Sequence, residues 1–189
     1  MSGVEFESGD ALLVVDVLAD FDHEDAVSLL RSFRDRSPAM ADAIEAARVA
    51  SVPVIYVNDD RDRWDSDAPA LAREAAGGPG GEAVRPLLPR AGDHVLLKHR
   101  YSAFDHTALE LLLAALDVER VVLVGAATEG CVVQTALDAR ERALKATIFA
   151  DACATTDEGL EETALRYAEE VGGIRVRRPN SRFGQERGV

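Results

Sequence analysis

Cysteine is scarce in this sequence, and the few metal-binding side chains are scattered. Cys131 and Cys153 are the only cysteines in 189 residues, which is too few for a disulfide framework. No CxxC pair and no Cys/His cluster is present, and the four histidines show neither HxH nor HExxH spacing. We therefore expect no structural zinc, no catalytic metal and no other cofactor.

Positive charge is also scarce. The chain has 21 Lys and Arg against 34 Asp and Glu, a formal net charge of -13, which disfavours nucleic acid and anionic membranes as partners. No apolar run approaches the roughly 18 residues that a membrane span needs. The acidic first residues, MSGVEFESGD, lack the basic-then-apolar pattern of a signal peptide. These absences predict a cytoplasmic protein.

Short apolar runs alternate with helical patterns along most of the chain. Strands are predicted at 11–17, 51–57, 94–98, 120–124, 146–150 and 174–176, and helices at 24–34, 38–50, 107–116, 130–143 and 157–171. This alternation predicts one α/β domain over 1–189, with residues 1–10 and 177–189 as terminal extensions. Its architecture is a three-layer α/β/α sandwich around a mainly parallel sheet of about six strands. The order of the strands does not follow from the sequence.

Three reactive side chains fall where predicted strands end. Asp16 follows the first strand, Lys98 ends the third, and Cys131 opens the helix after the fourth. Each has an ordinary explanation: a paired buried carboxylate, an exposed lysine, or a cysteine that serves as a small core residue. However, ligands of open α/β sheets bind at the carboxyl ends of the strands, and a helix N-terminus favours a thiolate. Together the three predict a site.

The same residues carry a family resemblance. Val15-Asp16-Val17, then KHRYSAF at 98–104, then GAATEGCV at 125–132 resemble the isochorismatase-like cysteine hydrolases, which include nicotinamidases and N-carbamoylsarcosine amidohydrolases. The resemblance extends from residue 11 to about residue 176 and implies the Rossmann-like fold of that superfamily. It also implies a homo-oligomer that acts on a small-molecule substrate.

By this resemblance Cys131 is the nucleophile, Asp16 is the general base, and Lys98 holds the two negative charges. The resemblance further implies a cis peptide bond between Ala126 and Ala127. The backbone N–H groups of Ala127 and Cys131 would then form an oxyanion hole.

One departure from the relatives affects the chemistry. Nicotinamidases carry an Asp-x-His metal motif after the second strand, and here Arg61 stands where the histidine would follow Asp59. We therefore expect metal-independent hydrolysis of a C–N bond in a small amide or ureide. The alternatives are an isochorismatase-type vinyl-ether hydrolase, a catalytically silent oligomeric scaffold, and a redox sensor that uses Cys131 with Cys153. True isochorismatases lack the nucleophilic cysteine, which favours C–N hydrolysis.

Four further residues are predicted to bind substrate: Asn58, Tyr101, Phe104 and Trp64. Core packing explains Tyr101 and Phe104 equally well. Trp64 lies in a polar, then glycine-rich region, 58–81, that we expect to be irregular and to form a lid or an interface. Arg61 and Arg100 are candidates for holding a substrate carboxylate, although arginines of this kind are more often simply exposed.

Several other polar residues are assigned structural roles. Thr128 and Glu129 are expected to shape the turn before Cys131, and Cys153 is expected to be buried. Glu161, Glu162 and Asp138 are interpreted as solvated helix faces or ion-pair partners.

Overall fold

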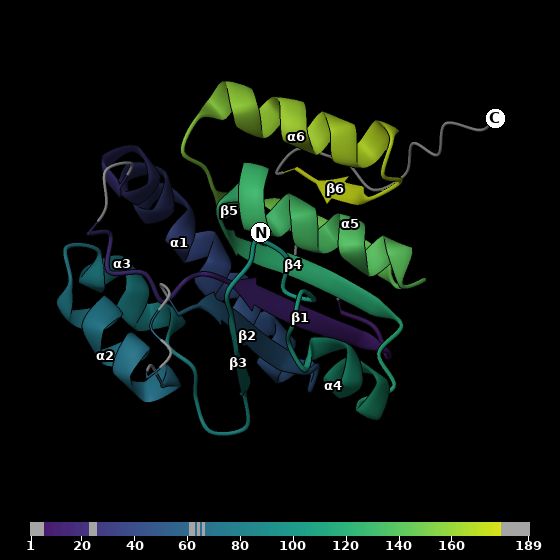
Figure 1. Ribbon diagram of the computed structural model, residues 1–189, viewed down its shortest axis with the longest axis horizontal. Coiled ribbons are helices and arrows are strands. Elements are labelled where there is room, and N and C mark those ends of the chain that lie inside the picture. Colours follow the sequence, from purple (N-terminus) through teal and green to yellow (C-terminus); the bar gives the residue numbers. More distant parts are fainter. Residues whose placement is uncertain (1–5, 23–25, 61–62, 64, 66, 179–189) are drawn as a thin grey trace.

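The computed structural model describes residues 6–22, 26–60, 63, 65 and 67–178. Its centre is a six-stranded sheet in which every neighbouring pair is parallel, in the order β3-β2-β1-β4-β5-β6 (Figure 1). The strands are β1 (Asp10–Val15), β2 (Val54–Asp59), β3 (His94–Lys98), β4 (Arg120–Ala126), β5 (Lys145–Ala154) and β6 (Arg175–Arg177). The predicted α/β fold with a parallel six-stranded sheet is confirmed.

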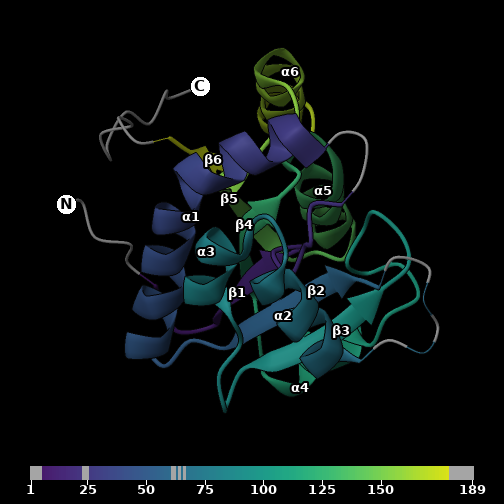
Figure 2. The ribbon, with the colours of Figure 1, turned by 90° about the vertical axis from the view of Figure 1, so that its left-hand side faces the viewer.

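Helices cover both faces of the sheet, which explains why the strands read as almost continuous apolar runs. One face carries α1 (Ala26–Val49), α2 (Ala68–Gly77), α3 (Gly81–Val84) and the short 3-10 turn η1 (Arg85–Leu87) (Figures 1 and 2). The other face carries α4 (Leu109–Ala115), α5 (Val133–Glu141) and α6 (Glu158–Glu170). Successive β1 residues alternate between the two cores, Leu12 toward α1 and Leu13 toward α5, and both are fully buried.

The strand order creates one topological switch point. From β1 the chain adds β2 and then β3 on one side, and it returns to the other side of β1 with β4. Crevices at such points are the usual ligand sites of open α/β sheets. The sequence did not give this order, and it is the order that brings the ends of β1, β3 and β4 toward one another.

The two predicted helices, 24–34 and 38–50, form a single continuous helix in the structure. One helix, α1, runs from Ala26 to Val49 with Pro38 inside it. Proline lacks the N–H that would bond the carbonyl four residues earlier, which belongs to Arg34. The hydroxyl of Ser37 donates to that carbonyl at 3.3 Å. This side-chain bond replaces the missing backbone bond, so the helix continues through the proline.

The region 58–81 is more ordered than predicted. It contains α2, which begins after the N-cap Asp67, whose carboxylate accepts from the N–H of Ala70 at 2.6 Å. Leu71 and Ala75 of α2 are buried against the core below α1. An alanine-rich segment with a good cap therefore forms a helix where composition had predicted an irregular loop. The predicted extensions also shrink slightly, because Asp10 begins β1 and Arg177 ends β6.

β5 contains an irregularity that matters below. Leu123 of β4 is paired with Ile148 of β5, but Gly125 is paired with Cys153. While β4 advances by two residues, β5 therefore advances by five. The additional residues form a bulge, and β5 is accordingly longer than the predicted strand 146–150.

No helix within the described residues is long and apolar enough to cross a membrane.

Candidate active site

Asp16 lies just beyond β1, at the switch point. Its φ is +50°, in the left-handed region that aspartate tolerates better than most side chains. One carboxylate oxygen accepts from the N–H of Asp59 at 2.6 Å, and the other lies 2.8 Å from Nζ of Lys98. The end of β2 therefore holds the carboxylate on one side, and the end of β3 holds it on the other.

Lys98 is the last residue of β3, and its side chain is fully buried. Its ammonium group donates to Sγ of Cys131 at 3.3 Å and to the carbonyl oxygen of Arg100 at 3.0 Å. With Asp16 at 2.8 Å, each of its three protons has an acceptor, and a carboxylate oxygen of Asp59 lies 3.9 Å away. Lys98 thus joins the first predicted residue, Asp16, to the third, Cys131.

Cys131 is presented by a tight turn of five residues, Thr128–Val132, which we call the Cys131 turn. The peptide bond before it, between Ala126 and Ala127, is cis. The carbonyl of Ala127 accepts from the N–H groups of Gly130 at 3.1 Å and Val132 at 3.2 Å. The chain therefore wraps around Cys131 before α5 begins, and the thiol sits at the N-terminal end of that helix.

A glycine allows this turn to approach Asp16. Gly125 has φ +128° and is paired with Val15, the residue before Asp16. A Cβ atom at Gly125 would lie 1.9 Å from the carbonyl oxygen of Val15. Any side chain would force β4 away from the end of β1, and with it the Cys131 turn.

Burial sets the protonation states of the three groups. Burial raises the pKa of Asp16, and the nearby Lys98 offsets only part of that effect. Burial and the negative charge of Asp16 raise the pKa of Cys131 to about 12, against the opposing influence of Lys98. Burial disfavours the charged form of Lys98, but Asp16 and Cys131 outweigh it, so its pKa is raised.

The resting thiol is therefore protonated, contrary to the thiolate that a helix N-terminus alone predicts, because desolvation outweighs the helix dipole. Cys131 is hydrogen-bonded to Asp16, whose raised pKa makes it a stronger proton acceptor than an ordinary carboxylate. This arrangement pairs a thiol with a base that can activate it.

The remaining predicted substrate-binding residues are placed differently from one another. Asn58 is buried: its Oδ1 accepts from the N–H of Leu18 at 2.8 Å, and its Nδ2 donates to the carbonyl of Leu18 at 3.3 Å. Phe104 lies in the α5-side core, 6% exposed, with the guanidinium of Arg142 4.8 Å from its ring centre. Both side chains make contacts that hold the fold, and their contact with substrate stays a prediction.

Tyr101 and Arg100 remain close to the surface. Tyr101 is 71% exposed, and its ring lies beside Gly130, within 4 Å of where a Cβ would be, which places it at the edge of the Cys131 turn. Arg100 is exposed, and its guanidinium donates to the carbonyl of His99 at 3.3 Å. The predictions for Trp64 and Arg61 lie outside the described residues.

Sequence reasoning missed three contributions to this region. The backbone N–H of Asp59 and the carbonyl of Arg100 position Asp16 and Lys98, and neither depends on a side chain that a motif could reveal. Glu161 was interpreted as solvated or ion-paired, and it is ion-paired with Arg36 at 2.8 Å. Its burial and its bond to Thr128 of the Cys131 turn at 2.9 Å were not predicted. Its place in the amphipathic pattern of α6, four residues before the buried Leu165, was the available signal.

Within the described part of the chain, no group of three or more His, Cys, Asp or Glu side chains is arranged to hold a metal ion. The two cysteines also differ in setting. Cys153 is fully buried, with Sγ 3.7 Å from the carbonyl oxygen of Leu123, whereas Cys131 is partly accessible. The predicted structural role of Cys153 fits this placement.

A thiol, a carboxylate and an ammonium group thus lie together at the switch point of a parallel α/β sheet, the usual place for a ligand site in such sheets. The isochorismatase domain family matches residues 10–177, and the chain belongs to that family of hydrolases.

Individual relatives support this assignment. An uncharacterized isochorismatase family protein of Bacillus subtilis, YaaI, is 32% identical over 161 residues, covering 85% of this chain and 89% of that protein. A ureidoacrylate amidohydrolase, RutB, of Methylorubrum extorquens is 31% identical over 167 residues, covering 71% of this chain and 63% of that protein. The crystal structure of N-carbamoylsarcosine amidase from Thermoplasma acidophilum matches with a TM-score of 0.68 and 32% identity, covering 93% of this chain and 99% of that chain.

Proposed function

We propose that the protein hydrolyses a C–N bond in a small amide or ureide, with Cys131 as nucleophile, Asp16 as general base and Lys98 as the group that holds their charges. The observation that carries this proposal is the contact of one buried ammonium group with both Asp16, at 2.8 Å, and Cys131, at 3.3 Å. A silent scaffold has no use for a buried charge cluster of this kind, which is costly to desolvate.

The proposed reaction has two halves. In the first, Asp16 accepts the thiol proton while Sγ attacks the substrate carbonyl, and the N–H groups of Ala127 and Cys131 stabilise the oxyanion. Collapse of this adduct breaks the C–N bond, and the leaving amine takes the proton from Asp16. In the second, Asp16 accepts a proton from water, which attacks the thioester. The acid product leaves, and the proton returns to the cysteine sulfur.

Lys98 contributes throughout by charge. While Asp16 is ionised, the ammonium group balances it, and once the proton has moved, the same group balances the sulfur. Because Lys98 contacts both atoms, the positive charge needs no rearrangement when the negative charge moves between them.

The relatives supply the substrate class for a first test. Their names include a ureidoacrylate amidohydrolase and an N-carbamoylsarcosine amidase, which both point to carbamoylated amines and ureido acids. Amides of small dicarboxylic acids extend the panel, because a maleamate amidohydrolase of Pseudomonas putida is 37% identical over 82 residues.

The experiment measures ammonia release from this panel by wild type, Cys131→Ala and the matched control Cys153→Ala, each with and without EDTA. We expect release from at least one compound that Cys131→Ala abolishes, that Cys153→Ala retains, and that EDTA leaves unchanged. Full activity in Cys131→Ala would overturn the nucleophile. A loss with EDTA that zinc restores would overturn the metal-independent mechanism.

A further inference from the structure

We propose that Glu129 is a positioning residue: by binding the segment before α6, it fixes the Cys131 turn so that Cys131 stays in contact with Asp16 and Lys98. This inference rests on the proposed function for its catalytic meaning. Glu129 stands two residues before Cys131. Its side chain is directed to Thr155 and Thr156, and not to the catalytic cluster, by which we mean Asp16, Lys98 and Cys131.

The contacts of Glu129 are specific. One carboxylate oxygen accepts from the N–H of Thr156 at 2.8 Å and also from the Thr156 hydroxyl, and the other accepts from the Thr155 hydroxyl at 2.8 Å. Both threonines belong to the β5–α6 loop, residues 155–157, which ends at Asp157, the N-cap of α6. A single side chain of the Cys131 turn therefore satisfies three donors of that loop.

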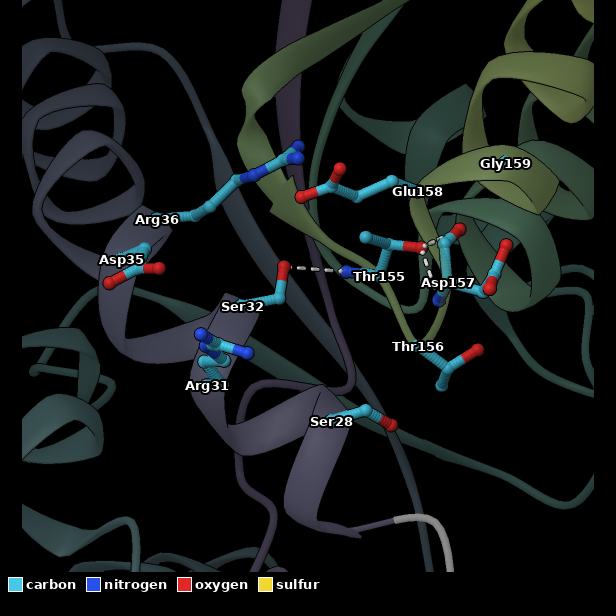
Figure 3. A pocket seen from close by; sticks show the side chains of 10 residues that line it. All are labelled: Ser28, Arg31, Ser32, Asp35, Arg36, Thr155, Thr156, Asp157, Glu158 and Gly159. Carbon is cyan, nitrogen blue, oxygen red and sulfur yellow. Dashed lines mark hydrogen bonds between the residues drawn. The ribbon is translucent and has the colours of Figure 1, made fainter.

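The loop is itself fixed from both ends. The N–H of Thr155 donates to the hydroxyl of Ser32 on α1 at 3.0 Å, and the Thr155 hydroxyl lies 2.9 Å from the carbonyl of Asp157 (Figure 3). Asp157 accepts from the N–H of Leu160 at 2.8 Å and so caps α6. Glu129 thus fastens the turn to a loop that two helices hold in place.

The neighbouring residue of the turn is fastened in a second way. The hydroxyl of Thr128 lies 2.9 Å from Glu161 of α6 and 3.0 Å from the carbonyl of Ala154. Glu161 in turn forms a two-point ion pair with Arg36 of α1, at 2.8 Å for each bond. Thr128 and Glu129 are therefore both held from outside, whereas Gly130, which follows them, departs from helical dihedral angles and lacks a side chain to hold.

The side of the loop that faces α1 is open to solvent. A pocket of about 590 Å³ lies between α1 and the β5–α6 loop, and Thr155, Thr156 and Ser32 are among the residues that line it (Figure 3). Thr156 is partly exposed on that side, so water competes for its hydroxyl, whereas Thr155 is buried at 3% exposure. A side chain that bonds to both threonines, as Glu129 does, therefore holds the loop on the side that faces this pocket.

The choice of variants separates positioning from charge. In Glu129→Gln the amide oxygen can accept from Thr156, and the amide N–H can donate to the Thr155 hydroxyl, which already has the Asp157 carbonyl as an acceptor. Glu129→Leu has similar size and no hydrogen bonds. Both remove the negative charge, but only the leucine removes the connection.

The first measurement is steady-state kinetics on a substrate found for the wild type. For Glu129→Leu we expect kcat to fall about 100-fold, the scale of a misplacement near 1 Å, with KM within about twofold. For Glu129→Gln we expect kcat within about threefold of wild type, since the connection is kept. Glu162→Leu, a change at an exposed glutamate of α6, serves as the matched control.

The second measurement needs no substrate: the rate of Cys131 alkylation by iodoacetamide between pH 8 and 9.5. Burial, together with the charge of Asp16, raises the pKa of Cys131 to about 12 against the opposing influence of Lys98. A loosened turn exposes the thiol to solvent and moves it away from Asp16, so its pKa falls toward the ordinary value and it reacts faster. We expect Glu129→Leu to alkylate about tenfold faster than wild type, and Glu129→Gln to match wild type.

Three outcomes overturn the inference. Wild-type kinetics and alkylation in Glu129→Leu would show that the turn needs no such connection. Equal effects in the glutamine and leucine variants would assign the effect to charge. A lowered melting temperature with unchanged kcat and alkylation would leave Glu129 a purely structural role.

A variant on the opposite side keeps the test valid if Glu129→Leu does not fold. Thr155→Val preserves shape and removes one donor to Glu129, and we expect both readouts to change about threefold in the same directions. If the wild type hydrolyses nothing on the panel but the alkylation pattern still appears, the proposed function fails while the positioning role stands.

Discussion

Two largely buried ion pairs contact the Cys131 turn, one through Thr128 and one through Cys131, and they differ in what they leave available for chemistry. Arg36 and Glu161 join α1 to α6, and Arg36 also donates to the carbonyls of Ala150 at 2.6 Å and Cys153 at 2.7 Å. Asp16 and Lys98 join the ends of β1 and β3, and they share a third partner, the thiol of Cys131.

The cation explains much of the difference. Arginine keeps its charge and offers a rigid fork of donors, which suits permanent connections to carbonyls and a carboxylate. Lysine is a compact charge that can serve two acceptors in turn, which suits a site where negative charge moves from carboxylate to sulfur. A buried ion pair therefore becomes a candidate for catalysis when a titratable third group is bonded to it.

Among changes in the two ion pairs, Asp16→Asn should have the largest effect on activity. We expect kcat to fall by roughly 10³-fold or more because the thiol loses its base. Asp16 raises the pKa of Cys131, so removing its charge lowers that pKa. Iodoacetamide should therefore alkylate Cys131 faster at pH 8 although hydrolysis is almost lost. Slower alkylation would contradict the assigned direction of the charge effect.

Lys98→Met should move the thiol in the opposite direction. Lys98 lowers the pKa of Cys131, so its loss raises that pKa further, and both alkylation and hydrolysis should slow, hydrolysis by roughly 10²-fold. The variant leaves Asp16 buried without its cation, so urea unfolding should also show a loss of a few kcal/mol. Alkylation faster than in the wild type would contradict the inference that Lys98 lowers the pKa of Cys131.

Changes in the Arg36–Glu161 ion pair should mainly alter the free energy of unfolding. Arg36→Met removes the partner of a mostly buried glutamate and should cost about 3 kcal/mol in urea unfolding. Arg36→Met combined with Glu161→Leu should recover part of that loss, because no charge is left buried alone. The corresponding double change in the Asp16–Lys98 pair, Asp16→Asn with Lys98→Met, should recover no activity. Recovered hydrolysis there would erase the distinction between the pairs.

The smallest effect concerns Asn58, whose side chain forms hydrogen bonds with the backbone of Leu18, two residues after Asp16. Asn58→Ala should lower stability by roughly 1–3 kcal/mol, because it leaves the buried backbone N–H of Leu18 without its acceptor. Substrate KM should change little, since Asn58 is bonded to backbone instead of facing the site. A KM raised more than about tenfold would instead support the predicted contact between Asn58 and substrate.

The sequence predicted the fold class and the three central residues because both depend on short-range patterns. Apolar runs mark strands buried on both faces, and a residue at a strand end is recognisable as such. Asp16, Lys98 and Cys131 were found in this way, and the comparison with known motifs added the cis bond that lies between Ala126 and Ala127.

What the sequence did not predict depends on long-range geometry. The N–H of Asp59 and the carbonyl of Arg100 acquire roles only once β2 and β3 are placed beside β1. Pro38 stays inside α1 because the Ser37 hydroxyl replaces a backbone bond, a compensation that composition does not reveal. Glu161 could be assigned to a helix from its pattern, but its connection to Thr128 joins segments 33 residues apart.

The bulge in β5 changes which face of the sheet the later side chains of this strand occupy. Side chains of a strand alternate between its faces, so an odd number of extra residues exchanges the two faces beyond the bulge. Because β5 advances five residues while β4 advances two, the surplus is odd. Before the bulge the even-numbered residues Ala146 and Ile148 face the core on the α5 side, and beyond it the odd-numbered Cys153 faces that core. The length of that insertion therefore sets which face of the sheet Cys153 and Ala154 occupy, directly before the loop that binds Glu129.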